Sequence, residues 1–429
     1  MKSRPVVVLV ADSLDALVRV CGVTMIDRIL RTLQRQGLET AFVLTSHPDA
    51  IRAELNKPSW ARRDIQTKVC VMSGASLTLG DVDRAVGERD ASRVLLLSAE
   101  GYFDSRLIDA LQGCEKSAVL VDSDPQHWLS LGTDAIKRAS YGLLCGAFLL
   151  ETGWIQSQPQ NVDLVSAVED QIAAKQIALV DVAILPSFQI SLRRSIRPLW
   201  FPAPSEAVRP IAEELVLDTA QKGAMEMISF LETPVENLVL RRLWNTSITP
   251  LQITFFGLIV GLGATVSFIF GHLWLGALLA LSVGVIDGLD GKQARVKVET
   301  TELGRWEGDM DYPVQMSWWI SLAWYFAHTI VGSHAIRWVL LFLVADILDK
   351  IFTRCVKEVT GRYLENYSGF DRVVLFFGGP RSLYVCLLIC GLIVSQPYGA
   401  FVLICCWHAS IGLIHGLRAA WICSRRRRV

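Results

Sequence analysis

The feature that most constrains the fold is a group of acidic residues between two long apolar runs. The first run, LWLGALLALSVGVI, is followed directly by Asp287, and the second, YPVQMSWWISLAWYF, begins directly after Asp311. A carboxylate at the centre of a bilayer costs about 2.5–3.5 kcal/mol on insertion scales. Acids at the ends of two membrane-entering helices therefore call for a reason, and we expect them to meet at one membrane face.

The spacing of these acids indicates a cation site. If both segments are helical, Asp287 and Asp290 share one helix face, as do Glu307 and Asp311. Mg²⁺ and Mn²⁺ take oxygen ligands, and carboxylates commonly share their coordination shell with substrate phosphates. We predict that these carboxylates converge on one or two such cations and hold them against a pyrophosphate. The simpler interpretation, that an acid only marks the wet end of a helix, suits any single Asp but not the whole pattern.

The same stretch resembles the signature of the CDP-alcohol phosphatidyltransferases, in which Asp-x-x-Asp-Gly-x-x-Ala-Arg is followed by Gly-x-x-x-Asp-x-x-x-Asp. The matching residues are Asp287, Asp290, Gly291, Ala294, Arg295, Gly304 and Asp311. The sequence departs from the signature at the third Asp, which is Glu307, and at the spacing between that residue and Gly304. A longer carboxylate can still bind metal, so the departure is compatible with activity.

The resemblance implies a role for each acid. Asp287, Asp290 and Glu307 would be ligands of two Mg²⁺ or Mn²⁺ ions, with Asp311 shared between them. Asp311 would also be the catalytic base that accepts the proton of an acceptor hydroxyl. The cations would neutralise the pyrophosphate of a CDP-alcohol and stabilise charge on the leaving CMP.

The other motif residues are expected to accommodate the substrate. By the same resemblance, Gly291 and Ala294 would let the nucleotide approach the helix, and Arg295 would offset phosphate charge or brace the acids. Upstream, the segment TPLQIT at 249–254 is similar to the Thr-Pro-Asn-x-x-Thr opening of the first membrane helix in this family, with Leu251 in place of Asn.

Apolar and charged residues are segregated along the chain. The composition is 52% hydrophobic and 20% charged, but the first 245 positions read as soluble α/β and the remainder as membrane protein. We predict an α/β domain over 1–190, a linker with a membrane-surface helix over 191–245, and a membrane domain over 246–429. The ten cysteines include no metal-type CxxC pair and are interpreted as reduced apolar residues. His408 and His415 are interpreted as packing or interfacial residues.

The N-terminal part favours a layered fold with a mostly parallel sheet, because strand-like and helix-like segments alternate. The run PVVVLVAD reads as a buried strand. A helix-period segment and further strands follow at 25–36, 41–45, 68–72, 94–98 and 118–122.

Residues 5–215 also resemble the sugar-1-phosphate nucleotidyltransferases, through VVVLVAD, VCGVTMIDRILRTLQRQGLETAFVLTSH and RVLLLSAEGYFDSRLIDAL. That family places a Gly-rich, basic loop after the first strand, where backbone N–H groups cradle a triphosphate. Here the loop is DSLDALVR, with no Gly and no Lys, and Glu100 replaces the usual metal-binding Asp. We therefore predict that the nucleotidyltransferase-like domain kept its fold and lost nucleotidyl transfer.

Six apolar segments follow, most near the ~20 residues that a helix needs to cross a bilayer. They lie at 250–270, 272–289, 311–331, 335–353, 373–394 and 398–420. Lys and Arg are concentrated before the first segment, in the second and fourth connections and after the last. The positive-inside rule then places both termini and the acidic motif on the cytoplasmic side of the inner or cytoplasmic membrane. Beside a membrane span, the Arg-rich end is a topology anchor, and no nucleic-acid partner is expected.

These features predict a membrane enzyme of phospholipid or polyol-phosphodiester synthesis. It would move a substituted phosphate group from a CDP-alcohol to an acceptor alcohol or lipid, release CMP, and form the homodimer that is usual in the resembled family. The domain order is similar to that of the bifunctional inositol-1-phosphate cytidylyltransferase/di-inositol-phosphate phosphate synthases. The alternative is a non-catalytic membrane scaffold built from relic enzyme domains. A transporter leaves the Gly, Ala and Arg spacing unexplained.

Overall fold

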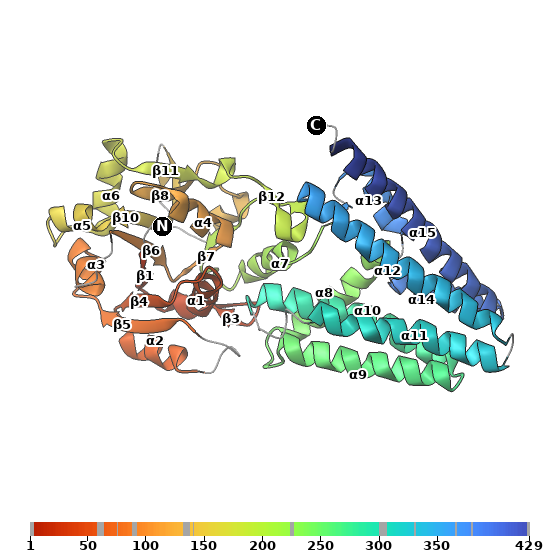
Figure 1. Ribbon diagram of the computed structural model, residues 1–429. Coiled ribbons are helices and arrows are strands. Elements are labelled where there is room, and N and C mark those ends of the chain that lie inside the picture. Colours follow the sequence, from red (N-terminus) through yellow and green to blue (C-terminus); the bar gives the residue numbers. More distant parts are fainter. Residues whose placement is uncertain are drawn as a thin grey trace. The chain divides into compact units, whose positions relative to one another are not determined.

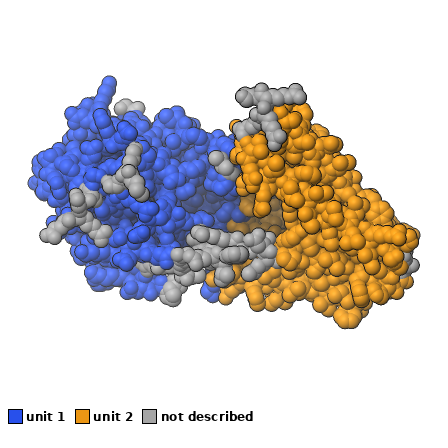
Figure 2. All heavy atoms as spheres, in the orientation of Figure 1, with its two compact units in different colours: residues 1–221, 244–247, 293–300 blue, residues 222–243, 248–292, 301–429 orange. Residues whose placement is uncertain are grey.

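The structure is a computed structural model that divides into two compact units, which are described separately (Figure 2). It describes residues 4–57, 64–74, 76–87, 92–131, 138–139, 141–223, 227–299, 307–329, 332–364, 367–378 and 381–426. Unit 1 comprises Met1–Gln221, Trp244–Ser247 and Gln293–Thr300, and unit 2 comprises Lys222–Leu243, Ile248–Lys292 and Thr301–Val429.

Unit 1 is built on an eight-stranded mixed sheet (Figure 1). Seven strands lie in the order β11-β8-β10-β6-β1-β4-β5, and the eighth, β9, pairs with β10. The strands are β1 (Val6–Ala11), β4 (Thr40–Thr45), β5 (Gln66–Val71), β6 (Arg93–Ser98), β8 (Ala118–Asp122), β9 (Arg138–Ala139), β10 (Gly142–Glu151) and β11 (Ala178–Asp181). β6, β1, β4 and β5 pair in parallel, as do β8 and β11. β10 is antiparallel to both β6 and β8, so it joins two parallel groups.

The predicted α/β architecture is confirmed, and its physical basis is visible in the central strands. The residues of β8 are all buried, and those of β1 are buried from Val7 to Ala11, as expected for strands covered on both faces. One core cluster joins these strands to side chains of α3, α5 and α6. The helices of this part are α1 (Met25–Arg35), α2 (Pro48–Leu55), α3 (Leu79–Val86), α4 (Ser105–Gly113), α5 (Thr152–Ser157) and α6 (Leu164–Ala173).

Residues 191–221, which the sequence assigned to a linker, belong to unit 1. Trp200 and Phe201 are buried in β14, which pairs antiparallel with β7. The short elements here and elsewhere in unit 1 are β2 (Arg19–Val20), β3 (Val23–Thr24), β7 (Gly101–Phe103), β12 (Phe188–Gln189), β13 (Arg194–Ser195), β14 (Trp200–Pro202), α7 (Arg209–Thr219) and the 3-10 helices Leu14–Leu17, His127–Leu131, Val182–Ile184 and Ile190–Leu192.

The described residues of unit 2 form helices and the turns between them (Figure 1). Its helices are α8 (Ser229–Leu243), α9 (Pro250–Ile269), α10 (Leu273–Val296), α11 (Glu307–Thr329), α12 (His334–Thr360), α13 (Gly369–Phe377), α14 (Arg381–Ile393) and α15 (Pro397–Arg426). Each predicted span overlaps one or two of these helices. By length and apolarity, three described helices, α9, α10 and α15, could each cross a membrane, or up to four if the bent pair α13 and α14 is one span. The count of six crossings remains a prediction.

The apolar residues of unit 2 lie both inside and outside the bundle. Trp318, Phe326 and Phe342 are buried in its core, whereas Phe255 and Leu262 of α9 are more than half exposed. Broad exposed apolar surface on long helices is typical of a membrane-embedded protein. The chain is therefore an integral membrane protein.

Candidate functional site

Asp290, the second acid of the motif, is buried at the helix pair α9 and α10. It is 3% exposed, and its Oδ2 accepts a hydrogen bond of 2.8 Å from the hydroxyl of Thr254. Thr249 caps α9 through a capping box with Gln252, and Pro250 occupies the first turn. The Thr-Pro opening thus starts α9 so that Thr254, one turn later, reaches the acid.

Asp287, one turn earlier on α10, has a different environment. Its side chain is 44% exposed and forms an ion pair with Arg381, the first residue of α14. The two acids share α10 as predicted, but they contact different neighbouring helices. Gly291 and Ala294 follow them on the same helix, both half-buried. The side chain of Arg295 does reach a partner: its Nε donates to the carbonyl oxygen of Ala220 at 2.6 Å.

The second half of the motif is only partly described. Asp311 is half-buried near the start of α11. Gly304 and the side chain of Glu307 lie outside the described residues. Among the residues that the structure describes, no three or more His, Cys, Asp or Glu side chains are placed to hold a metal ion. The predicted cation site therefore stays a prediction.

α8 brings two acids to the motif helix that the sequence reading missed. Glu232 and Glu236 are buried, and they contact α10 at Gly284 and Gly288, where an added Cβ would lie 2.4 Å and 2.0 Å from their Oε1 atoms. The two glutamates are four residues apart, as are the two glycines that they contact. This matching spacing is the only feature of the sequence that indicates the contact. Lys292, inside the motif, forms a buried ion pair of 2.6 Å with Glu236.

The outward side of α8 is apolar. Phe230, Leu231, Val235 and Leu238 are between 47% and 71% exposed. The helix thus turns its acids inward and its large apolar residues outward, the reverse of a helix on a soluble protein. This arrangement favours the predicted helix at the membrane surface.

A second polar cluster joins α11, α12 and α15. The hydroxyl of Tyr312 donates to Asp346 at 2.6 Å, and the carboxylate of Asp346 lies 3.7 Å from His408 Nε2. His415 Nδ1 lies 2.5 Å from Asp349. The two histidines thus contact acids of α12, an interaction that their interpretation as packing residues did not include.

In unit 1, the loop after β1 satisfies its own backbone. The N–H of Ser13 donates to Glu100 at 2.5 Å, and the N–H of Asp15 donates to the hydroxyl of Ser13. Burial raises the pKa of Glu100. Two backbone amides of this loop, those of Ser13 and Asp15, are therefore already occupied by side-chain acceptors.

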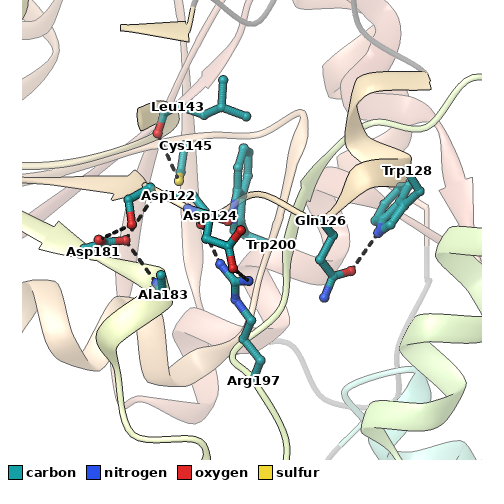
Figure 3. Close-up of polar contacts among 11 residues, drawn as sticks. Asp122, Asp124, Gln126, Trp128, Leu143, Cys145, Asp181, Ala183, Arg197 and Trp200 are labelled. Carbon is teal, nitrogen blue, oxygen red and sulfur yellow. Dashed lines mark hydrogen bonds and ion pairs between the residues drawn. The ribbon is translucent and has the colours of Figure 1, made fainter. Parts of the chain in front are cut away.

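The acids at the ends of β8 and β11 are also engaged (Figure 3). Asp122, 2% exposed, accepts hydrogen bonds from Arg197 at 2.5 Å and from the indole N–H of Trp200 at 2.7 Å. Asp181 accepts from Ser123 and from the N–H of Ala183. These contacts fasten residues 194–202 to the sheet, so the predicted linker arginine Arg197 is part of the fold.

Comparison with known protein families gives a match in the membrane part of the chain. Residues 247–348 match the family described as CDP-alcohol phosphatidyltransferase. The C-terminal part of the chain carries a CDP-alcohol phosphatidyltransferase domain. The matched range contains the whole motif from Asp287 to Asp311. The domain assigns the chain to the transferases of phosphate-containing groups, with a CDP-alcohol and an alcohol acceptor as substrates.

No curated protein matches the sequence. Solved structures of other proteins are similar to the N-terminal half of this chain. The inositol-1-phosphate CTP transferase from T. maritima has 11% identity and a TM-score of 0.33, and the match covers 47% of this chain and 89% of that one. HddC from Yersinia pseudotuberculosis has 13% identity and a TM-score of 0.35, and the match covers 49% of this chain and 99% of that one.

Proposed function

We propose that the chain moves a substituted phosphate group from a CDP-alcohol to an acceptor alcohol or lipid and releases CMP, in phospholipid or polyol-phosphodiester synthesis. The observation that carries this proposal is the placement of Asp287 and Asp290 on one helix inside the matched range, with Asp290 buried against Thr254. A buried carboxylate that is held by a hydroxyl donor keeps a fixed position for a substrate-bound cation.

The carboxylates fit a hard divalent cation. Asp287, Asp290, Glu307 and Asp311 offer only oxygen donors, the ligand type that Mg²⁺ and Mn²⁺ prefer. We propose that they hold two such ions, which supply charge neutralisation at the pyrophosphate.

The chain's own residues supply the remaining steps. Asp311 accepts the proton of the acceptor hydroxyl as that oxygen attacks the β-phosphorus of the CDP-alcohol. The bond from the β-phosphorus to the bridging oxygen breaks, and CMP leaves with the bridging oxygen. Gly291 and Ala294 leave space for the nucleotide beside α10.

The α/β unit is proposed to lack nucleotidyl transfer. The hydrogen bond from Ser13 to Glu100 supports this, because it closes the loop that would receive a triphosphate. Full-length protein supplied with CTP and a panel of polyol phosphates is expected to form no CDP-alcohol. Formation of a CDP-alcohol would contradict the proposal.

The proposed arrangement in the membrane follows from charge. Both termini and the motif face the cytoplasm, α8 lies at the membrane surface through Phe230 and Leu231, and two chains form a homodimer.

The deciding experiment measures CMP release by purified full-length protein with a panel of CDP-alcohols and acceptor alcohols, in Mg²⁺ or Mn²⁺ and in EDTA. Metal-dependent release that is lost in Asp311→Asn supports the proposal, and the productive pair identifies the substrates. Absence of release from folded protein under every combination favours the non-catalytic scaffold.

A further inference from the structure

The end of α10, just beyond the motif acids, is held in a strained turn inside unit 1. The N–H of Glu299 donates to the carbonyl of Ala294 at 2.9 Å and that of Val298 to the carbonyl of Arg295 at 3.3 Å, while Val298 has a φ of +54°. This is the hydrogen-bond pattern of a Schellman cap, in which Gly usually takes the left-handed position. A β-branched Val there costs about 1–2 kcal/mol, so the surroundings must stabilise the turn.

Two buried arginines of α1 supply that stabilisation. Arg28 Nη1 donates to the carbonyl of Val296 at 2.5 Å, and Arg31 Nη1 donates to the carbonyl of Lys297 at 2.7 Å. The arginines are 3% and 2% exposed. Because the last carbonyls of a helix have no partner within it, two guanidinium donors satisfy them and complement the negative end of the helix dipole.

Each arginine is itself fixed. Arg28 Nη2 donates to the carbonyl of Val20 at 2.7 Å, and its guanidinium lies 5.6 Å from the ring centre of Tyr102. Tyr102 stacks on Phe201 with ring centres 4.7 Å apart. Arg31 also pairs with Glu299 at 3.3 Å, with both side chains buried. The guanidinium positions are therefore set by the fold of unit 1 and not by a flexible loop.

Two basic side chains of the helix end reach outward to the same unit. Arg295 Nε donates to the carbonyl of Ala220, and Lys297 Nζ donates to the carbonyl of Thr246 at 3.0 Å. Residues 295–299 are thus held in two ways: their carbonyls accept from the arginines of α1, and their own basic side chains donate to carbonyls elsewhere in unit 1. These contacts fix residues 295–299 within unit 1.

We propose that Arg28 and Arg31 are positioning residues for phosphotransfer, and that the α/β unit serves the reaction by holding the helix that carries the motif. This inference rests on the proposed function. Asp290 lies six residues before Val296 on one continuous helix, about 9 Å at 1.5 Å per residue. A displacement of about 1 Å at reacting groups can cost 10²-fold in rate, so release of the helix end is expected to lower kcat.

The test compares Arg28→Ala and Arg31→Ala with Arg35→Ala, a matched change in the last turn of α1. Hydrogen exchange of the amides of residues 295–299 in the full-length protein reads the hold on the helix end, and CMP release reads its effect. We expect the first two variants to exchange at least tenfold faster and to lose kcat at least tenfold with little change in KM, and Arg35→Ala to match the wild type.

A second substitution separates positioning from general damage. Val298→Gly relieves the left-handed strain, so Arg31→Ala combined with Val298→Gly is expected to recover part of both the protection and kcat. Normal exchange in both arginine variants overturns the inference, as does faster exchange with unchanged kcat.

Failure of the proposed phosphotransfer function can be distinguished from failure of the positioning role of Arg28 and Arg31. If the wild type releases no CMP, the affinity of the motif for Mn²⁺, measured by electron paramagnetic resonance, replaces turnover as the readout of motif geometry. Affinity lowered in Arg28→Ala and Arg31→Ala but not in Arg35→Ala supports the positioning role, and equal affinity in all three overturns it.

Discussion

The hydroxyl of Thr254 donates to the carboxylate of Asp290 across 2.8 Å, between two residues that are both more than 90% buried. Thr254→Val removes this donor at nearly constant volume and leaves the carboxylate oxygen less satisfied, at a cost of about 1–3 kcal/mol. We expect the variant to have lower thermal stability and to need a higher Mg²⁺ or Mn²⁺ concentration for half-maximal CMP release.

Thr254→Ser keeps the hydroxyl and is expected to stay close to the wild type. Thr265→Val is the matched control on α9, because Thr265 bonds to Ser317 rather than to a motif acid. Equal activity in Thr254→Val and Thr265→Val would show that the bond to Asp290 has no special role.

The buried pair of Glu236 and Lys292 gives a second prediction. Glu236→Gln leaves a buried ammonium without its counter-charge, and we expect a loss of about 3–5 kcal/mol in the free energy of unfolding. Replacement of both residues by Met should recover most of that loss, because no isolated charge remains. Chemical unfolding in detergent measures both variants.

The exposed pair of Glu206 and Arg209, 3.8 Å apart, is the control. Its removal is expected to cost no more than about 1 kcal/mol. Additive effects of the two single changes, Glu236→Met and Lys292→Met, would contradict a coupled pair.

The sequence predicted the strands that are uninterrupted apolar runs, such as β1 and β6, because such runs can only be buried. It did not identify β10, GLLCGAFLLE, where Gly146 has a φ of +76° and the register with β8 shifts between Leu144 and Phe148. A strand that contains a bulge loses the regular pattern by which strands are recognised.

The motif on α10 was also predictable, because its residues lie close together in sequence. Glu236 was not, since its contact with Gly288 depends on two helices that are far apart in the chain. The alternation of apolar and charged residues in α8 indicated a surface helix but could not show which side faces inward. Arg28 and Val296 are 268 residues apart, and no local pattern connects them.

The departure at Glu307 gives a third prediction. Glu307→Asp restores the residue that is usual in the resembled signature, and we expect CMP release to rise by up to roughly tenfold, or about 1.4 kcal/mol of transition-state stabilisation. EDTA should abolish release in both forms, and added Mg²⁺ or Mn²⁺ should restore it. Activity that persists in EDTA would exclude the proposed metal dependence.

Glu100 gives a pH dependence. Burial raises its pKa in the folded protein above 4.5, so the protonated form is favoured by folding. Its contribution to stability is complete below pH 4.5 and is lost as the pH rises through the raised pKa. Glu100→Gln lacks this titration, and its stability relative to the wild type should therefore increase across that window.

Hydrogen exchange of the β1 amides at several pH values, in the full-length protein, measures this difference in unit 1 directly. A difference between Glu100→Gln and the wild type that does not change with pH would contradict the prediction.

The orientation of the membrane domain gives a fifth prediction. A fluorescent protein that folds only in the cytoplasm, fused after Val429, is expected to be fluorescent, and a periplasm-dependent phosphatase at the same place is expected to be inactive. Removal of the terminal arginines is expected to weaken this preference, because they contribute to the positive-inside signal. The opposite pattern of reporter activity would place the C-terminus outside.

The chain leaves unit 1 after Ser247 and returns to it at Gln293, so α9 and α10 form a hairpin with both ends in one folded body. During synthesis, α1 emerges first, yet the carbonyls that receive Arg28 and Arg31 are made only after both helices of the hairpin. The guanidinium groups of Arg28 and Arg31 therefore cannot form these hydrogen bonds until residues 296 and 297 have been synthesised. Completion of the first-made unit is in this way coupled to membrane insertion of a segment that is translated much later.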